Sequence, residues 1–450
     1  MVFKMALQDK ELLKQSWAVS WPMSLIMFFI FLIGIADVYV AGLFGKEIQA
    51  AYGLASQIYF IFSIMVFGLT VGTVSVVSRL FTSDNKEEFN RAVDSSFLIA
   101  VVLGILFSLL GIGFSKGIIY SMPVPEVLKE RAVSFMRVYS FALLFSYLLI
   151  NTNGILRACK MVKKSLITMA VVCVLNICLN FILAFKTPLG FTGIAVSTLV
   201  SMSVGALLNF IFVRRLMGDV FSFSFSISKR LFAVGWPAAA LQVVWQIASV
   251  VLYFILSALP QNRVEVLAAF TNGLKVESAI FLPAFAFNMA SAVVVGNLLG
   301  ARKRHDAFHA GILTALLGVI VVTVMTLVVI TNARRISSFL SQNVLVVAES
   351  TRYIIISLLF EPVMAWGVIL GGALNGAGDT RGVTKITALC LWFVRIPLSY
   401  LLGIHFRLGV AAIWWSMNVS ILCQSIFISR RYFSRRWIDH EVAENYVDKP

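Results

Sequence analysis

Long apolar runs, separated by short polar segments, follow one another along the entire chain. Each run is about 20 residues long, which is the length that an α-helix needs to cross a bilayer. Cutting the chain where charges, Pro or Gly end a run predicts twelve membrane-spanning helices. Their expected ranges are 17–44, 50–81, 92–115, 132–156, 165–185, 192–213, 231–258, 266–299, 309–331, 353–375, 383–402 and 410–428. The pattern therefore predicts an all-α polytopic membrane protein.

The amino-acid composition agrees with this fold class. Of the 450 residues, 60% are hydrophobic and 13% are charged, whereas soluble domains are about half apolar and a quarter charged. The five cysteines form no CxxC pair, so we expect neither a disulfide framework nor a metal site built on them. The first residues have both charge signs and lead into an apolar run longer than a signal-peptide core, so we expect the first helix to be retained.

The basic residues occur in short clusters between the apolar runs. A net charge of +16 would also suit a nucleic-acid-binding protein, but such proteins gather their basic residues on one face or arm. Here the two termini, alternate loops and the span ends next to them hold 24 Lys and Arg, while the opposite loops and span ends hold 11. Because positive residues stay on the cytoplasmic side, this bias predicts that both termini lie in the cytoplasm.

The two halves of the chain resemble each other at an offset of 218 residues. Residues 50–51 then align with 268–269, and residues 154–156 align with 372–374. The nearly constant offset predicts two six-helix lobes, residues 1–218 and residues 219–450, the second with a cytoplasmic tail. Because each lobe has an even number of spans, we expect a pseudo-two-fold axis along the membrane normal. Transporters of this architecture work by alternating access.

Asp37 is a single carboxylate inside the first apolar run. An ionised side chain at bilayer depth costs at least about 2.5 kcal/mol, so one that is retained there usually faces a protein interior or a water-filled cavity. A helix-end acid that reaches the headgroups is the alternative. The equivalent position of the second lobe is Ile255, which favours a coupling site in the first lobe over an acid required by the fold.

Several segments, in order along the chain, carry a family resemblance. They are IADVYVAGLFGKEIQAAYGLASQI, VSVVSRLF, NGILRACKMVKKS, LNICLNFILAF, GFTGIAVST, VGWPAAALQ, ASAVVVGNLLGARKRHDA, LNGAGDTRG and WFVRIPLSYLLG. With these segments at twelve-helix spacing, the chain resembles the multidrug and toxic compound extrusion transporters. The resemblance extends over nearly the whole chain.

The resemblance implies a bacterial or archaeal inner-membrane antiporter with two six-helix bundles in a V around a central cleft. Such proteins export amphipathic, often cationic, small molecules against an inward flow of H⁺ or Na⁺. No other cofactor is implied, the bilayer is the surrounding medium, no nucleic acid is involved, and we expect a monomer. In prokaryotic members an aspartate of the first helix, matching Asp37, binds the coupling cation, and a proline that bends this helix matches Pro22.

Asn176 and Asn180 are four residues apart, so they lie on one face of the fifth predicted helix. Hydrogen bonding between helices is one reading of such a pair. The family resemblance implies a cation site there, formed by an Asn and an acid, but the second residue of this chain is Asn180. Asp37 is then the only carboxylate among the matched residues.

This difference bears on the coupling ion. Asp37, Asn176, Asn180 and Thr198 offer oxygen ligands for Na⁺ if the helices converge as the resemblance implies. A proton needs only one buried carboxylate. We favour H⁺, and we expect no metal other than Na⁺ at Asp37.

Three further polar residues, Tyr139, Asn151 and Asn153, lie on the fourth predicted helix. They resemble a polar network that supports the family's cation site. Helix packing is the alternative for each of them.

The second lobe has its own charged residues within apolar runs, namely Lys275, Glu277 and Glu361. A neutralising pair between Glu361 and either Lys275 or Arg395 is one expectation. The alternative is that Glu277 or Glu361 forms a second proton or substrate site.

Other classes of protein are less compatible with the sequence. An intramembrane enzyme needs a catalytic constellation at bilayer depth, but the four histidines fall in loops, near helix ends or in the tail. A lipid-linked oligosaccharide flippase of the same wider superfamily is the closer alternative. Such a protein needs a strongly cationic cleft, whereas away from their ends the predicted spans hold only Lys275 and Arg395 as cations.

Overall fold

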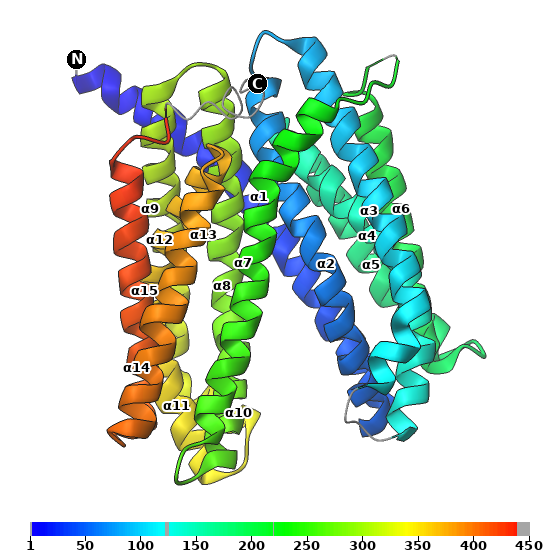
Figure 1. Cartoon of the computed structure of the whole chain (residues 1–450), viewed down its shortest axis with the longest axis vertical. Coiled ribbons are helices and arrows are strands. Elements are labelled where there is room, and N and C mark those ends of the chain that lie inside the picture. Colours follow the sequence, from blue (N-terminus) through cyan, green and yellow to red (C-terminus); the bar gives the residue numbers. More distant parts are fainter. Residues whose placement is uncertain (1, 122–125, 219, 439–450) are drawn as a thin grey trace, which may run out of the picture. The chain divides into compact units, whose positions relative to one another are not determined.

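The computed structural model describes residues 2–121, 126–218 and 220–438, and all regular secondary structure in this part is helical (Figure 1). The first seven α-helices are α1 (Val2–Leu43), α2 (Lys46–Phe81), α3 (Lys86–Tyr120), α4 (Glu126–Ala158), α5 (Val162–Phe185), α6 (Gly193–Arg214) and α7 (Phe225–Ser257). The others are α8 (Arg263–Gly300), α9 (Arg304–Thr331), α10 (Ala333–Leu340), α11 (Val344–Leu358), α12 (Glu361–Gly376), α13 (Thr380–Leu389), α14 (Ile396–Tyr400) and α15 (Val410–Phe433). In the described part of the chain, eleven helical segments are long and apolar enough to cross a membrane, and α11 with α12, taken as one span, makes a twelfth. The predicted polytopic all-α fold is confirmed.

Two predicted spans are less regular than the sequence suggested. The tenth, expected as one helix over 353–375, consists of α11 and α12, which are bent by 49° at a short break. Pro362 stands in the first turn of α12, where it lacks the N–H that would continue the preceding helix. The eleventh contains π-helical turns at Cys390–Arg395 and Leu401–His405, on either side of α14. Local turns of this kind accommodate interruptions of the regular ladder, here next to Pro397.

The chain divides by its contacts into two compact units. Among the described residues, the amino-terminal unit comprises Leu25–Ala239, and the carboxyl-terminal unit comprises residues 2–24 together with residues 240–438. The division therefore falls inside α1 and inside α7. The lobe boundary at residue 218 remains a prediction from the sequence repeat.

Within the amino-terminal unit, α4 packs against α2, α3, α5 and α6. The first part of α7 also belongs here, because it lies against α2 where Gly68 faces Gly235. Neither position has room for a Cβ atom, so the two backbones approach closely. The segment before α7 is fixed to α3, since the Ser222 amide donates to Asp94 at 3.0 Å and the Ser224 amide donates to Ser95 at 2.9 Å.

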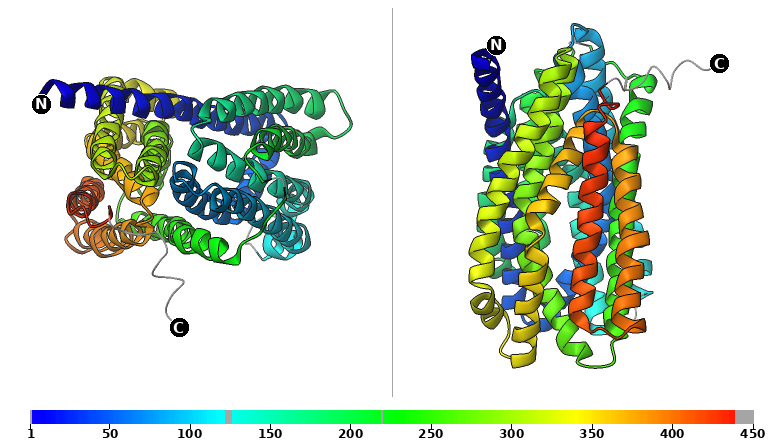
Figure 2. Two further views of the ribbon diagram at one scale, coloured as in Figure 1. Left: turned by 90° about the horizontal axis from the view of Figure 1, so that it is seen from above. Right: turned by 90° about the vertical axis from the view of Figure 1, so that its left-hand side faces the viewer.

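Within the carboxyl-terminal unit, α8 packs against α9, α11 and α12, and α15 packs against α12. The helices of this unit run lengthwise beside one another in the right-hand view of Figure 2, where α15 is red. The beginning of α1 belongs to the same unit. Thr314 of α9 donates to the Ser16 hydroxyl at 2.8 Å, and the Trp17 ring lies 6.4 Å from the ring of Phe287.

Replacing Gly372 by Ala is expected to destabilise the carboxyl-terminal unit by about 1–3 kcal/mol. An added methyl group would overlap the backbone oxygen of Asn288, where α12 meets α8. Gly113 of α3 is the matched control, because a Cβ there meets no heavy atom within 4 Å and Ala is the better helix former. Thermal unfolding in detergent should give a lower Tm for Gly372→Ala and an equal or higher Tm for Gly113→Ala. Equal Tm values for both variants would contradict the close packing of α8 and α12.

Candidate functional site

Asp37 lies in the second half of α1 and is buried in the amino-terminal unit, with only 2% of its surface exposed. Asn180 Nδ2 donates to Asp37 Oδ1 at 2.6 Å, and the Tyr52 hydroxyl donates to Asp37 Oδ2 at 3.4 Å. The two donors come from α5 and α2. The aspartate is therefore held inside the helix bundle, and the alternative of an acid that extends to the headgroups is wrong for this structure.

Asn180 connects Asp37 to a wider hydrogen-bonded network. Its amide nitrogen also donates to Asn176 Oδ1 at 3.2 Å, and its carbonyl oxygen accepts from the Ser197 hydroxyl. Asn176 Nδ2 in turn donates to the Thr198 hydroxyl at 3.3 Å. The structure thus brings together all four residues that the sequence assigned to the cation site. Thr198 belongs to the outer part of the network, because no hydrogen bond joins it directly to Asp37.

Aromatic side chains pack around Tyr52, which donates to Asp37. The ring of Tyr139 stacks on that of Tyr59 at a centroid distance of 4.2 Å. Phe135 contacts both Tyr52 and Tyr139 with its ring. Tyr139 of α4 therefore adjoins the network by ring packing, because Phe135 contacts both Tyr139 and Tyr52.

The charge of Asp37 has no compensating cation. Within the described part of the chain, its hydrogen-bond partners are neutral and it forms no ion pair. A buried carboxylate is costly unless it is paired or binds a cation. The arrangement is therefore chemically suited to take up a proton or a monovalent cation reversibly.

Pro22 is buried in α1, fifteen residues before Asp37. At 1.5 Å per residue the two lie about 22 Å apart along the helix axis. The boundary between the compact units follows Ser24, two residues after this proline, and the boundary in α7 follows Ala239, two residues after Pro237. Proline removes one hydrogen bond of the helix ladder, so both helices have a weak point where they pass from one unit to the other.

Asn151 and Asn153 are not part of the network around Asp37, contrary to the prediction. Asn151 accepts from Thr73 at 2.9 Å and donates to the Ser96 hydroxyl at 2.8 Å. Asn153 accepts from Ser165 at 2.6 Å and from Asn209 at 2.8 Å. Each asparagine thus connects α4 to its neighbouring helices. Asn151 lies about 18 Å from Tyr139 along α4, since twelve residues separate them. Asn151 and Asn153 therefore both fit the alternative of helix packing.

The charged residues of the carboxyl-terminal unit form a different arrangement from the expected pairs. Glu277 accepts a hydrogen bond from the Tyr353 hydroxyl, and Arg395 attracts it electrostatically. The guanidinium of Arg395 lies 5.2 Å from the ring centre of Trp245. Glu361 is only 1% exposed, and neither of its carboxylate oxygens has a hydrogen-bond partner among the described residues. The expected neutralisation of Glu361 by Arg395 is not formed.

Lys275 is exposed rather than buried, because it faces outward from α8. It forms no ion pair with Glu361 in the part of the chain that the structure describes. Glu277 is two residues further along the helix and therefore points in another direction. The lysine has no place in a buried second-lobe site.

Two residues of the site were not predicted, namely Tyr52 and Ser197. Tyr52 supplies one of the two direct hydrogen bonds to Asp37, and Ser197 fixes the carbonyl of Asn180. Ser197 directly precedes Thr198, and Tyr52 lies near the start of α2, fifteen residues after Asp37. A tyrosine in an aromatic-rich helix gives no signal of its own, so its proximity to Asp37 becomes visible only when α1 and α2 pack together.

A comparison with protein families matches the chain to the MatE family model twice, over residues 22–182 and residues 237–401. The "Probable multidrug resistance protein NorM" of Thermotoga maritima is 24% identical over 419 residues, covering 90% of this chain and 89% of that protein. The "Multidrug resistance protein NorM" of Vibrio vulnificus strain YJ016 is 23% identical over 438 residues, covering 92% and 93%.

Solved structures share the fold. A structure described as "Crystal structure of MATE in complex with MaL6" superposes with a TM-score of 0.88 at 20% sequence identity and covers 94% of this chain and 97% of that chain. The family consists of membrane transporters and is not a class of enzymes. The two matches of the family model, one in each half of the chain, confirm the resemblance inferred from the sequence. This chain belongs to the MatE family of multidrug efflux transporters.

Proposed function

We propose that this protein is a cation-coupled antiporter that exports amphipathic, often cationic, small molecules. The single observation that carries this proposal is the buried, hydrogen-bonded but uncompensated carboxylate of Asp37. The names of the multidrug resistance relatives support the substrate class. We place the protein as a monomer in the inner membrane of a bacterial or archaeal cell, with both termini in the cytoplasm because the loops on that side are richer in Lys and Arg.

The proposed coupling ion is H⁺. Asp37 is the only carboxylate of the network, so the site has one negative charge to attract a cation. The oxygens of Asn176 and Asn180 already accept hydrogen bonds from Asn180 and Ser197. Na⁺ would have to share or displace these accepted hydrogen bonds, because each amide oxygen has two lone pairs, whereas a proton needs only one oxygen of Asp37. This comparison favours proton coupling.

The proposed mechanism makes substrate and ion compete through the state of the amino-terminal unit. Protonation of Asp37 from the outside removes its negative charge and with it the attraction for a cationic substrate. The helix bends near Pro22, and the substrate is released outward. The protein then turns inward and gives up the proton. Because each ligand favours a different state, the binding of one opposes the binding of the other.

Efflux from proteoliposomes with separately imposed gradients tests the proposed function. Wild-type protein should move ethidium against its gradient when an inward pH gradient is imposed, and a Na⁺ gradient of equal size should have no effect. Ethidium transport driven only by Na⁺ would contradict proton coupling. Absence of transport under both gradients would contradict the antiport proposal and favour the lipid-linked oligosaccharide flippase, which the named relatives do not support.

We propose that Glu361 is the acid of the carboxyl-terminal unit that remains available for a proton or for the cationic group of a substrate. Glu277 is engaged by Tyr353 and Arg395, whereas Glu361 has no hydrogen-bond partner among the described residues. An isolated buried charge costs several kcal/mol, so removing it should not harm the fold.

The variant Glu361→Gln is therefore expected to unfold at the same or a higher temperature than wild type. Glu277→Gln is the matched control. It leaves the buried guanidinium of Arg395 without its opposite charge, so we expect a loss of about 2 kcal/mol. Thermal unfolding measures the stabilities, and ethidium efflux measures the role in transport. Wild-type efflux by a folded Glu361→Gln variant would contradict the proposed second site.

A further inference from the structure

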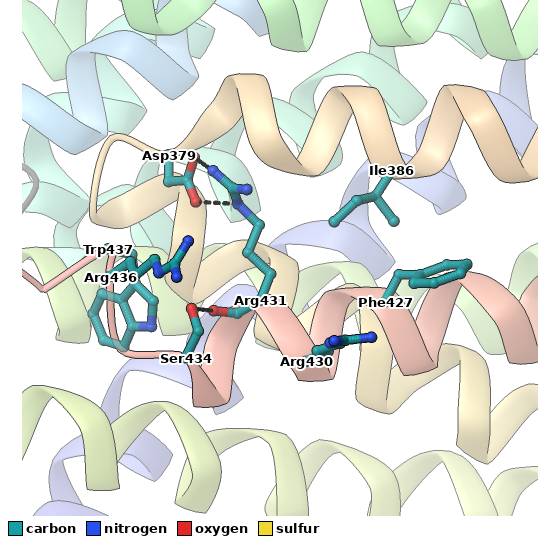
Figure 3. A pocket seen from close by; sticks show the side chains of 8 residues that line it. All are labelled: Asp379, Ile386, Phe427, Arg430, Arg431, Ser434, Arg436 and Trp437. Carbon is teal, nitrogen blue, oxygen red and sulfur yellow. Dashed lines mark hydrogen bonds and ion pairs between the residues drawn. The ribbon is translucent and has the colours of Figure 1, made fainter.

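A basic cavity lies at the end of α15, where the chain leaves its last membrane span. Its volume is about 540 Å³, which falls in the range of pockets that hold small molecules or headgroups. Eight side chains line it, namely Asp379, Ile386, Phe427, Arg430, Arg431, Ser434, Arg436 and Trp437 (Figure 3). The cavity belongs to the carboxyl-terminal unit and shares no residue with the network around Asp37.

Asp379 fixes one of the three guanidinium groups of the cavity. Arg431 Nε donates to Asp379 Oδ2 at 2.5 Å, and Arg431 Nη2 donates to Asp379 Oδ1 at 2.7 Å, as the dashed lines of Figure 3 show. Gly382 of α13 leaves room for this group, because a Cβ at that position would overlap the guanidinium. A bidentate pair of this kind sets the orientation of the arginine as well as its position.

A tight turn after α15 positions Arg436, another of the three arginines that line the cavity. Arg435 adopts the left-handed conformation, with φ of 58°, two residues after the end of α15. The Ile438 amide donates to the Arg435 carbonyl at 3.0 Å, and the indole nitrogen of Trp437 donates to the Tyr432 carbonyl at 2.7 Å. The chain is thereby turned back along the last turn of α15, with Trp437 buried and Arg436 in the wall of the cavity.

The cavity has a net positive charge, and its lining has both charged and apolar side chains. The lining contains three arginines and one aspartate, and neither Arg430 nor Arg436 forms an ion pair within the described residues. Phe427 and Ile386 add apolar surface next to these charges, and Phe427 is 49% exposed. An anion with an apolar body matches both parts. At the end of a membrane-spanning helix, such a ligand is a lipid.

We propose that this cavity binds the phosphate headgroup of an anionic phospholipid. The phosphate contacts Arg430 and Arg436, while Arg431 is held in place by Asp379. The first part of an acyl chain lies along Phe427 and Ile386. The site is independent of the transport cycle, so its test does not depend on ion coupling at Asp37.

Native mass spectrometry of the full-length protein in detergent tests the proposal. The probes are phosphatidylglycerol, phosphatidylcholine and soluble glycerol phosphate. Wild-type protein should bind phosphatidylglycerol at least about tenfold more tightly than phosphatidylcholine. The double variant Arg430→Gln/Arg436→Gln should bind phosphatidylglycerol roughly 25-fold more weakly, because each basic residue near an anionic lipid contributes about a factor of five.

The control Arg302→Gln/Lys303→Gln removes the same charge from the same side of this unit, at exposed positions outside the cavity. It should retain wild-type binding of phosphatidylglycerol. Equal binding by wild type and the Arg430/Arg436 variant would overturn the proposal, as would equal losses in both double variants. Binding of glycerol phosphate as tight as that of phosphatidylglycerol would also overturn it, in favour of a soluble phosphate ligand. Because Arg430 and Arg436 are exposed, the lipid-free Tm of their variant should match that of wild type.

Discussion

Asp37→Asn is expected to reduce gradient-driven efflux strongly while leaving the protein folded. The amide keeps an oxygen that accepts from Asn180, and its nitrogen can donate to the Tyr52 hydroxyl, so the hydrogen bonds of the site remain possible. What is lost is the group that changes charge. Coupling free energies between two ligands are about 1–3 kcal/mol, so efflux should fall by roughly 5- to 150-fold. Ethidium efflux from proteoliposomes with an imposed pH gradient measures the effect.

Asp94→Asn is the matched control for this variant. Asp94 is also a buried carboxylate of the amino-terminal unit, but it lies on α3 and accepts from the backbone amide of Ser222. The same chemical change at this position should leave coupled efflux close to that of wild type. Equal losses in the two variants would mean that any buried carboxylate of this unit affects transport through the fold, and Asp37 would then not be the coupling site.

Asn180→Asp is expected to convert the protein to Na⁺ coupling. The variant places a second carboxylate at the 2.6 Å contact that Asn180 now makes with Asp37. Two ionised groups about 4 Å apart repel each other by about 4 kcal/mol at an effective dielectric constant of 20. A bound cation relieves this repulsion, so an inward Na⁺ gradient should increase ethidium efflux by at least about tenfold. Proteoliposomes loaded without a pH gradient isolate the effect of Na⁺.

Asn176→Asp is the control for the position of the second acid. Asn176 lies one helical turn from Asn180, and no hydrogen bond joins it to Asp37. We therefore expect a much smaller response to Na⁺ from this variant. A folded Asn180→Asp protein that remains insensitive to Na⁺ would contradict the view that the number of carboxylates beside Asp37 selects the coupling ion.

The centre of the site could be predicted because its residues are unusual for a membrane-spanning helix. A lone carboxylate in an apolar run identified Asp37, and the spacing of Asn176 and Asn180 placed both on one face of α5. The family resemblance then connected α1, α5 and α6. Periodicity alone does not determine which faces of separate helices meet, and for that reason Tyr52 and Ser197 were missed.

The asparagines of α4 show a second limit of the sequence. Asn151 and Asn153 are two residues apart, so they point away from each other and bind different neighbours. Asn151 faces Thr73 and Ser96, while Asn153 faces Ser165. Both asparagines lie in the same lobe as Asp37, but neither belongs to the hydrogen-bonded network around Asp37. An asparagine that forms hydrogen bonds between helices and an asparagine that supports a cation site look the same in the sequence, so the sequence does not distinguish the two roles.

The apolar pattern of the sequence also did not predict the broken helices of the carboxyl-terminal unit or the arrangement of its charged residues. The bend between α11 and α12 leaves the run apolar on both sides, so hydropathy predicts one continuous span. Glu361 stands at the start of α12, directly after this bend. Its separation from Lys275 and Arg395 follows from the three-dimensional course of α8, α12 and the π-helical segment of the eleventh span, which no spacing rule describes.

Proton release on substrate binding is the most direct test of the central claim that substrate and proton compete at Asp37. Ethidium is added to the detergent-solubilised protein in a weakly buffered solution containing a pH indicator. Wild type should release about one proton for each ethidium bound, and Asp37→Asn should bind ethidium without releasing a proton. Equal proton release by the two proteins, or none by wild type, would contradict the account.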